Sequence, residues 1–430
     1  LSGGVDEATG RLSITQDINE GTIPNTDLTK TSINLSGNVQ LGNRLNAQFK
    51  TTYVKNHSDN IPYNGYDAGN VMQSIGGWFG RQVNMSALEA NWNKLDPFGK
   101  PYTWSYYYHD NPYWTVNRKP TERTRDRIFG NAQLRYTITD WLNATARFGT
   151  DYFTERRKRS IWEMSNENKN NGGQFWENKR TLQETNFDFI VNFDKTFGED
   201  LRLDGLAGAH YRKYDYNFSL LQAAELTVPN FFHISNVSGS ATTDQTIEES
   251  EQNSVYGQVN LSYKDFLFIG GTARNDWSST LPSDNWSYFY PSGNINVVFT
   301  ELFNIPVVSF GKIFTSYAIV GNDTDPYRVF NTYEISAPFG SAGWASNNSQ
   351  LANPALDPER MKSYEVGIEA NFFDRRVGFD LSYYNSQTEN QITPVPVSMA
   401  SGFTSVFFNA GTIENKGVEV SLRLNPIRTE

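Results

Sequence analysis

Residues 33–50 read INLSGNVQLGNRLNAQFK, and apolar and polar side chains alternate along them on both sides of a short polar turn. Successive side chains of a β-strand point to opposite faces, so this alternation predicts strands with one apolar and one polar face. Ile33, Leu35 and Val39 share the apolar face, and the residues between them are polar or glycine. The sequence Leu41-Gly42-Asn43-Arg44 is typical of a turn. Residues 33–50 therefore predict an antiparallel hairpin.

The same alternation recurs along the chain and predicts an all-β protein with fourteen strands. They lie near residues 9–18, 30–41, 44–57, 125–139, 142–157, 181–197, 201–218, 249–263, 266–277, 288–300, 309–321, 362–373, 376–390 and 412–424. Most exceed the ~9–11 residues that a tilted strand needs to cross a bilayer core, whereas strands of soluble proteins usually have about 5–6 residues. The lengths therefore favour membrane-spanning strands.

Short and long connections alternate between these strands. Short turns fall at residues 41–44, 139–141, 197–200, 263–266 and 373–376. Long polar connections fall near residues 58–124, 158–180, 219–248, 278–287, 322–361 and 391–411. An antiparallel up-and-down transmembrane β-barrel has short periplasmic turns and long extracellular loops. We expect Gly3-Gly4-Val5-Asp6 to form a further turn, so that this end and Asn425 both lie on the periplasmic side.

The composition fits a membrane barrel and excludes a helical membrane protein. Only 38% of the 430 residues are hydrophobic, the mean hydropathy is −0.57, and no run approaches the about 18 apolar residues of a membrane helix. Aromatic residues make up 14%, which fits membrane interfaces but also an aromatic-rich soluble β-sandwich or propeller. The lack of cysteine is compatible with the cell envelope, and the net charge of −10 argues against a nucleic-acid partner.

Aromatic side chains flank the short turns, and the polar strand faces carry Asn, Gln, Arg, Asp and Glu. The residues at strand ends predict a girdle at the membrane interface: Trp141, Phe197, Tyr263, Phe266 and Phe373. Polar groups facing a dry core would each cost on the order of 2–7 kcal/mol. A wet or plug-filled lumen removes that cost, so we expect the polar faces to line a route or a housing.

The sequence contains no motif for catalysis. His57, His109, His210 and His233 lack the spacing of a zinc site, and neither G-x-S-x-G nor a phosphate-binding Gly-Lys-Ser/Thr loop occurs. The run Asn-Asp-Thr-Asp at 322–325 offers oxygen ligands for calcium but lacks the rest of a calcium loop, so a turn is favoured. We expect no enzyme activity, no metal site and no cofactor.

The connection 58–124 is dense in aromatic residues. Its candidate contacts for a ligand or partner are Trp104, Tyr106, Tyr107, Tyr113 and Trp114, and Trp344 in the glycine-rich segment 337–349 is a weaker candidate. Exposed aromatic clusters usually meet another protein or the apolar face of a sugar or peptide. The alternative is that the loop packs on itself over the barrel mouth.

Several stretches of the sequence are specific enough to compare with known families. The most specific are NPALDPE at 353–359, which is followed by YEVG at 364–367, and NAGTIENKGVE at 409–419. Further stretches are DNPYW at 110–114, RNDWSS at 274–279 and FDLSYYN at 379–385. Together they resemble motifs of the SusC/RagA-like TonB-dependent transporters, and the similarity extends over nearly the whole chain.

This resemblance implies an outer-membrane transporter of the Bacteroidota whose barrel has about 22 strands around an N-terminal plug. It also implies import of glycans or peptides, a SusD-like surface lipoprotein as a lid, and energy from TonB acting on a plug region. Neither the plug nor a TonB-contacting segment is found in the sequence, which we expect to be a partial barrel domain of a longer polypeptide. An intact native mass near 48.8 kDa would contradict that expectation.

Two other function classes remain open at this point. One is an outer-membrane receptor, adhesin or structural barrel without active import. The other is a soluble β-protein that degrades polysaccharides, which would be extracted without detergent. A plug and a TonB segment encoded upstream would favour the transporter.

Overall fold

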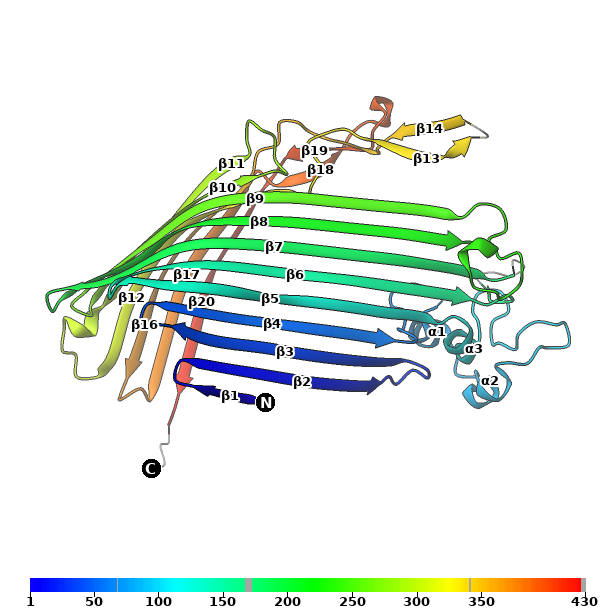
Figure 1. Ribbon diagram of the computed structural model, residues 1–430, viewed down its shortest axis with the longest axis horizontal. Helices are drawn as coiled ribbons and strands as arrows, with labels where there is room; N and C mark the ends of the chain where they lie inside the picture. The colour runs from blue at the N-terminus through cyan, green and yellow to red at the C-terminus, as the bar shows by residue number, and fades with distance from the viewer. Residues whose placement is uncertain (68, 167–171, 340–341, 427–430) are drawn as a thin grey trace.

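The computed structural model describes residues 1–67, 69–166, 172–339 and 342–426. Its main feature is one antiparallel sheet of fifteen strands, hydrogen-bonded in the order of the chain (Figure 1). The strands are β1 (Ser2–Val5), β2 (Ala8–Glu20), β3 (Asp27–Leu41), β4 (Leu45–Ser58), β5 (Thr121–Thr139), β6 (Leu142–Ile161), β7 (Gln174–Phe197), β8 (Leu201–Ala223), β9 (Thr242–Tyr263), β10 (Leu267–Ser278), β11 (Ser287–Val298), β12 (Val308–Asn322), β16 (Glu359–Phe372), β17 (Val377–Glu389) and β20 (Thr412–Leu424). β1 and β20 are the two edges of the sheet.

The fourteen predicted strands are all confirmed, and the up-and-down topology is the predicted one. The main difference is length, because several strands extend further towards the long loops than alternation indicated. β7 has 24 residues and β8 has 23, so part of the sheet continues well past the about 9–11 residues of a bilayer crossing.

The predicted turn at Gly3-Gly4-Val5-Asp6 is wrong. Gly3, Gly4 and Val5 belong to β1, which pairs with β2, and the turn lies at Asp6–Glu7. The glycine pair is typical of turns, but here it serves a close approach: a Cβ on Gly4 would lie 2.5 Å from the Ala8 carbonyl oxygen. The sheet therefore has fifteen strands, one more than predicted.

The register places like side chains side by side across strands. Ile33 pairs with Tyr53, and Tyr53 pairs with Ile128, so an apolar band runs across β3–β5. On the opposite face Asn34 pairs with Thr52, whose hydroxyl donates to the Asn34 side chain at 2.8 Å. The polar face is the concave one, and concavities on it are lined by polar residues of β5–β9. A one-residue slip would exchange the two faces, so the pattern fixes the register.

The short connections gather at one end of the sheet and the long ones at the other (Figure 1). The turn between β9 and β10 has Lys264 and Asp265 at φ 48° and 55°. Positive φ at both central residues is the geometry whose twist matches the flanking strands. Gly198 adopts φ 67° in the turn between β7 and β8, a conformation that glycine adopts without strain.

The long connections contain more regular structure than the sequence indicated. The elements are α1 (Val71–Trp78), α2 (Met85–Asn91), α3 (Pro112–Arg118), the hairpin β13 (Tyr333–Phe339) and β14 (Ala342–Asn347), the small sheet of β15 (Gln350–Leu351), β18 (Ile392–Pro396) and β19 (Ser405–Asn409), and 3-10 turns at Ile234–Asn236 and Met399–Ser401. A further 3-10 turn, Phe299–Glu301, lies in the connection between β11 and β12 at the other end of the sheet. Among the described residues, no helix is long and apolar enough to cross a membrane.

Candidate functional site

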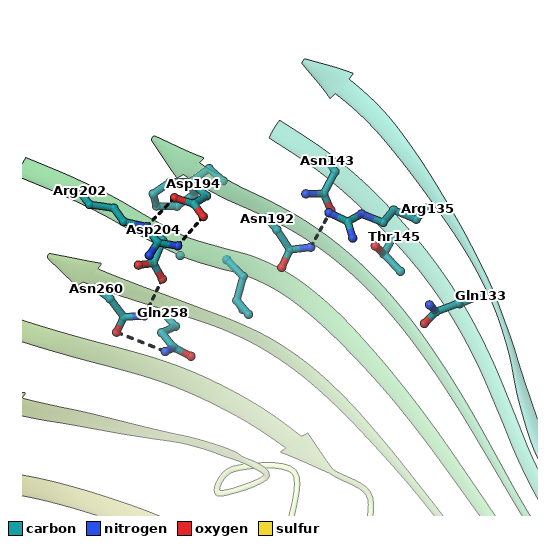
Figure 2. Close-up of a pocket in the computed structure, with 13 residues that line it drawn as sticks. Gln133, Arg135, Asn143, Thr145, Asn192, Asp194, Arg202, Asp204, Gln258 and Asn260 are labelled. Atoms are coloured by element: carbon teal, nitrogen blue, oxygen red, sulfur yellow. Dashed lines mark hydrogen bonds and ion pairs between the residues drawn. The ribbon is translucent and has the colours of Figure 1, made fainter. Parts of the chain in front are cut away.

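The concave face carries paired polar side chains near the short-turn end (Figure 2). Arg202 on β8 donates two hydrogen bonds to the Asp194 carboxylate on β7, at 2.9 and 2.6 Å. Asn260 on β9 donates to Asp204 at 2.9 Å, and Asn192 donates to an asparagine on β6 at 3.2 Å. These bonds run sideways between neighbouring strands, so the polar groups satisfy one another along the wall and the surface stays wettable.

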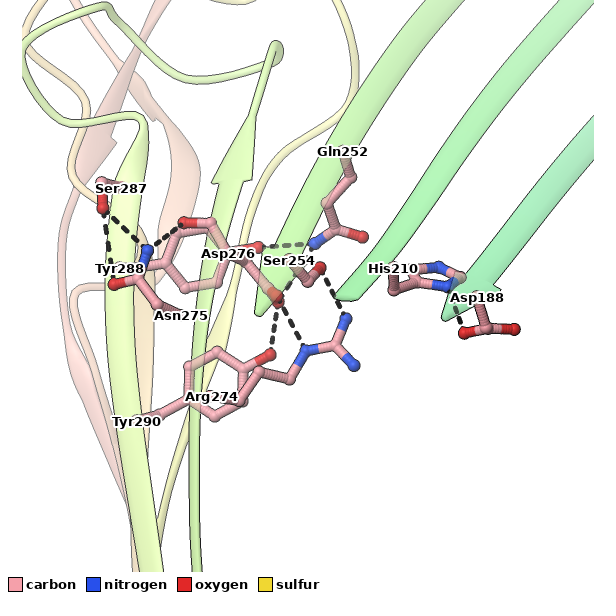
Figure 3. Close-up of polar contacts among 10 residues, drawn as sticks. All are labelled: Asp188, His210, Gln252, Ser254, Arg274, Asn275, Asp276, Ser287, Tyr288 and Tyr290. Carbon is pink, nitrogen blue, oxygen red and sulfur yellow. Dashed lines mark hydrogen bonds and ion pairs between the residues drawn. The ribbon is translucent and has the colours of Figure 1, made fainter. Parts of the chain in front are cut away.

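Asp188 on β7 joins three strands further along the same face. Its carboxylate accepts from Arg147 Nε on β6 at 3.0 Å. It also lies 2.8 Å from His210 Nδ1 on β8 (Figure 3). The register places Arg147 and His210 directly opposite Asp188 on its two neighbouring strands, so all three side chains lie on the concave face. Alternation predicted the face of Asp188, but its partners depend on the register.

Asp276 on β10 is the most densely bonded carboxylate of this face (Figure 3). It accepts from Arg274 Nε at 2.7 Å, from Gln252 Nε2 at 3.2 Å and from the Tyr290 hydroxyl. The Tyr290 ring stacks on Tyr288, with centroids 5.9 Å apart. Because Arg274 and Asp276 are two residues apart on one strand, the RNDWSS motif places this pair on one face.

We predict that Asp276→Ala destabilises the barrel wall by about 2 kcal/mol. The carboxylate is only 3% exposed, so its loss leaves three donors without an acceptor. The cost stays below that of a fully buried ion pair because Arg274 remains partly hydrated. Urea titration of the protein in lipid vesicles measures this difference.

The matched control for that prediction is Asn275→Ala. Asn275 is the neighbouring residue, faces the other side and bonds Ser287 at an exposed position. It is expected to cost less than about 1 kcal/mol. Equal losses for the two variants would contradict a special role for the Asp276 cluster.

The predicted loop aromatics occupy two different environments. Trp114 on α3 is 7% exposed and donates from Nε1 at 2.9 Å to Ser165 of the neighbouring connection 158–180, so its side chain packs between two long connections. Tyr113 is half-buried on the same helix, and Tyr106 is just over a third exposed. Tyr107 is 80% exposed. Their role as contacts for a ligand or partner stays a prediction, as does that of Trp344, which is about half exposed on β14.

The DNPYW motif organises this loop. The buried Asn111 caps α3 by accepting from the Tyr113 backbone N–H at 3.0 Å, and Pro112 occupies the first turn. The Asn111 side chain also donates to the carbonyls of Leu88 and Tyr102, which ties α2 and the following segment to α3. The cap and proline are sequence signals for a helix that strand-based reasoning missed.

Four rings form a cluster beside α3. Trp104 stacks on His109 with centroids 5.2 Å apart and meets Phe79 edge-on at 4.5 Å, and Trp78 lies 5.4 Å from His109. His109 Nδ1 is 3.2 Å from Ser74 Oγ on α1. Burial lowers the pKa of His109 below its usual value; nearby Asp110 opposes this shift, and Lys119 adds to it.

We predict that this loop loosens in mild acid. The pKa of His109 is lower in the folded loop than the about 6.5 of an unfolded chain. Its contribution to stability is therefore complete above pH ~6.5 and is lost as the pH falls from there through the lower pKa of the folded loop, because the open loop binds the proton more readily. Hydrogen exchange of residues 71–118 between pH 8 and pH 5 measures the effect. His109→Phe, which keeps a ring but does not titrate, should remove it; an unchanged pH response would contradict the assignment.

The NPALDPE motif joins two long connections, 322–361 and 391–411. Leu356 is fully buried against Val329 and Phe407. Asn409, from the NAGTIENKGVE motif, accepts from the Asp357 backbone N–H at 2.8 Å and donates back to its carbonyl at 2.7 Å. Glu359 accepts from the Ile392 backbone N–H at 2.8 Å. The two most specific sequence motifs therefore meet in one junction.

The predicted girdle residues lie at the short-turn end. Trp141 and Phe197 are both about half exposed, and the Lys195 ammonium lies 5.1 and 5.4 Å from their ring centroids. Tyr263 and Phe266 pack edge to face at 5.7 Å, and Phe373 is exposed in its turn. A lysine beside aromatic rings suits an interface, where its head stays in water. The girdle role itself stays a prediction.

The acidic and histidine side chains are spread out rather than gathered into a metal centre. Residues 1–67, 69–166, 172–339 and 342–426 contain no group of three or more His, Cys, Asp or Glu that could hold a metal ion. In the 322–325 run, the Asp323 carboxylate accepts from the hydroxyls of Ser278 at 2.5 Å and Thr280 at 3.2 Å. It thereby anchors the loop entrance to the end of β10.

The comparison with protein families identifies the class of this fold. A model described as TonB dependent receptor-like, beta-barrel matches residues 77–428. The chain therefore belongs to the TonB-dependent receptor β-barrel family. Members of this family are outer-membrane β-barrel proteins, transporters and receptors rather than enzymes, and the chain is assigned to the outer membrane.

Curated relatives support the SusC/RagA-like assignment. TonB-dependent receptor P3 of Formosa agariphila is 28% identical over 337 residues, which cover 75% of this chain and 33% of that protein. TonB-dependent receptor SusC of Bacteroides thetaiotaomicron is 24% identical over 188 residues, which cover 41% of this chain and 19% of that protein. The chain spans about a third of the length of the Formosa relatives that it matches.

Solved structures show the same fold. The RagAB peptide transporter matches with a TM-score of 0.81 and 19% identity, over 98% of this chain and 47% of that chain. The RagAB peptide importer in its closed-closed state matches with a TM-score of 0.82 and 18% identity, over 100% of this chain and 48% of that chain.

Proposed function

We propose that this chain forms part of the barrel wall of an outer-membrane transporter that imports glycan or peptide nutrients. The observation that carries this proposal is the concave face, where polar groups pair sideways from the Arg202–Asp194 bond to the Asp276 cluster. A wall of this kind suits a hydrated route, whereas the apolar convex face suits lipid. On this proposal the long-loop end faces the outside and the chain catalyses no reaction.

The proposed transporter includes parts outside these residues. Further strands complete the wall, because open sheet edges are not tolerated in lipid. A plug region couples the barrel to TonB, and a SusD-like lipoprotein covers the long-loop end. The likeness of the fold to that of the RagAB peptide transporter supports a paired assembly of this type. The exposed hairpin β13–β14, with Ile335 and Trp344, offers apolar surface for such a lid.

Uptake in cells separates import from the alternative of a receptor, adhesin or structural barrel. A strain lacking the full gene should lose accumulation of a labelled nutrient from its own medium, and the gene should restore it. Restoration should fail when TonB is absent. Nutrient bound at the surface but not accumulated, with or without TonB, would instead favour the receptor.

A further inference from the structure

Arginines gather on the concave face where β5, β6 and β7 approach the long loops. We call this set the arginine patch; it comprises Arg123, Arg125, Arg127, Arg157 and Arg180. The three arginines of β5 occupy alternate positions, so they share one face at spacings of about 6.6 Å. The register brings Arg157 and Arg180 to the same face from the next two strands. This density of positive charge lies in a chain whose net charge is −10.

Two carboxylates hold three members of the patch. Glu155, whose side chain is 3% exposed, accepts from Arg123 Nε at 2.8 Å and from Arg157 Nε at 2.7 Å. Arg127 forms a two-pronged ion pair with Asp151. The acceptor oxygens of Glu155 are thus used by its diagonal neighbour Arg123 on β5 and by Arg157, two residues further along its own strand β6.

Arg125 and Arg180 lie directly opposite Glu155 on its two neighbouring strands, yet neither bonds to it. The Nε atom of each is buried and has no hydrogen-bond partner, and neither residue forms an ion pair among the residues described. Their guanidinium groups rest on rings instead, Arg125 at 3.8 Å from the Phe153 centroid and Arg180 at 5.4 Å from the Phe218 centroid. The rings hold the guanidinium planes in place. Both residues are only partly buried and their terminal Nη groups are not among the buried atoms, so it is these outer groups that a ligand can reach.

We infer that Arg125 and Arg180 form a binding site for the carboxylates of an acidic ligand on the concave wall. Neither guanidinium has an acidic partner, and an incoming oxyanion would bond to its exposed terminal Nη groups and supply one. A planar guanidinium matches a carboxylate with two parallel hydrogen bonds, and a ring behind it reduces the freedom lost on binding.

The spacing of the two residues indicates more than one anionic group. Arg125 and Arg180 are separated by the strand that carries Glu155, so their backbones lie about 10 Å apart, two strand spacings. A ligand with carboxylates on successive units would reach both, whereas a single monoanion would reach one. The site therefore favours ligands with several carboxylates, and both acidic oligopeptides and uronic-acid oligosaccharides have them.

This inference rests on the proposed function only in placing the site on the route of a nutrient. Binding is therefore measured without energy coupling, on the purified full-length protein with its associated subunits in detergent. The probes are tri-glutamate and a galacturonic acid trimer, and tri-glutamine is the neutral counterpart. Calorimetry compares the natural protein with the double variant Arg125→Gln/Arg180→Gln.

The matched control is Arg156→Gln. Arg156 lies on β6 beside the patch but points to the convex face, where it pairs with Glu177. We expect the double variant to bind an acidic probe about tenfold or more weakly, and the control to change less than about twofold. Added salt should weaken binding to the natural protein. An unchanged heat-modifiable band on a detergent gel shows that each variant retains its barrel.

The outcomes are decisive in either direction. Tighter binding of tri-glutamate or of the uronate trimer than of tri-glutamine, lost in the double variant, supports the site and names the source of the carboxylate. Equal affinity for the neutral probe, no binding of either acid, or no effect of the double variant overturns it. Nutrient uptake that persists in that case leaves the proposed function standing, and acid binding without uptake leaves only the site.

Discussion

Replacing Phe189 with arginine is expected to destabilise the membrane-inserted protein by about 2–4 kcal/mol and to prevent assembly in much of the population. Phe189 lies on the convex face of β7, and it is 47% exposed between Ala146 and Ala209 on the neighbouring strands. Because the two alanines are small, they cover little of the Phe189 ring, and in the membrane the ring contacts lipid. A guanidinium at this depth has neither water nor an acidic partner.

The adjacent residue provides the control. Ile190 faces the concave side between Thr145 and Gly208, so Ile190→Arg places the same charge one position away on the wet wall. It should cost less than about 1 kcal/mol, because the guanidinium can hydrate there. Urea titration in lipid vesicles and the yield of heat-modifiable protein measure both variants. Comparable losses would contradict the division into a lipid face and a wet face, and a larger loss for Ile190→Arg would mean that the two faces are assigned the wrong way round.

This pair also shows why so much of the fold was predictable. Phe187, Asp188, Phe189 and Ile190 lie on one strand, and a strand that is wet on one side and apolar on the other repeats every two residues. That period specifies element type, direction and face without any knowledge of distant residues. The exception among the turns was Gly3-Gly4, because glycine permits a turn and a close strand approach equally.

The candidate site was less accessible to sequence reasoning. Asp188 was predicted to face the lumen, but its bonds to Arg147 and His210 depend on which residues of β6 and β8 stand opposite. The lack of an acidic partner for Arg125 also depends on the register, because Glu155 lies opposite it but bonds Arg123 and Arg157 instead. In the loops, aromatic density predicted contacts, yet Trp114 is buried and Tyr107 is exposed within one connection. Composition does not encode that difference; the packing of α3 does.

Truncating Leu356 to alanine is expected to open the junction of the long connections while leaving the barrel wall intact. Leu356 is fully buried against Val329 and Phe407, with Ile392 beside them. Removing a fully buried leucine side chain costs about 2–5 kcal/mol, and little else in this cluster can fill the space. Hydrogen exchange should therefore rise in the segments 350–357 and 390–409, while exchange in β16 and β17 stays near its original level.

Met399, in the connection 391–411 that packs on Leu356, supplies the matched control, because it is 78% exposed and Met399→Ala removes little packing. It should leave exchange in both segments unchanged. If Leu356→Ala instead speeds exchange throughout β16 and β17, the junction and the wall unfold together, and the loops are part of the barrel's own stability. If exchange rises only in the loops, the NPALDPE motif holds the long connections together independently of the barrel wall. The loops could then move while the wall stays fixed, as a lidded transporter would require.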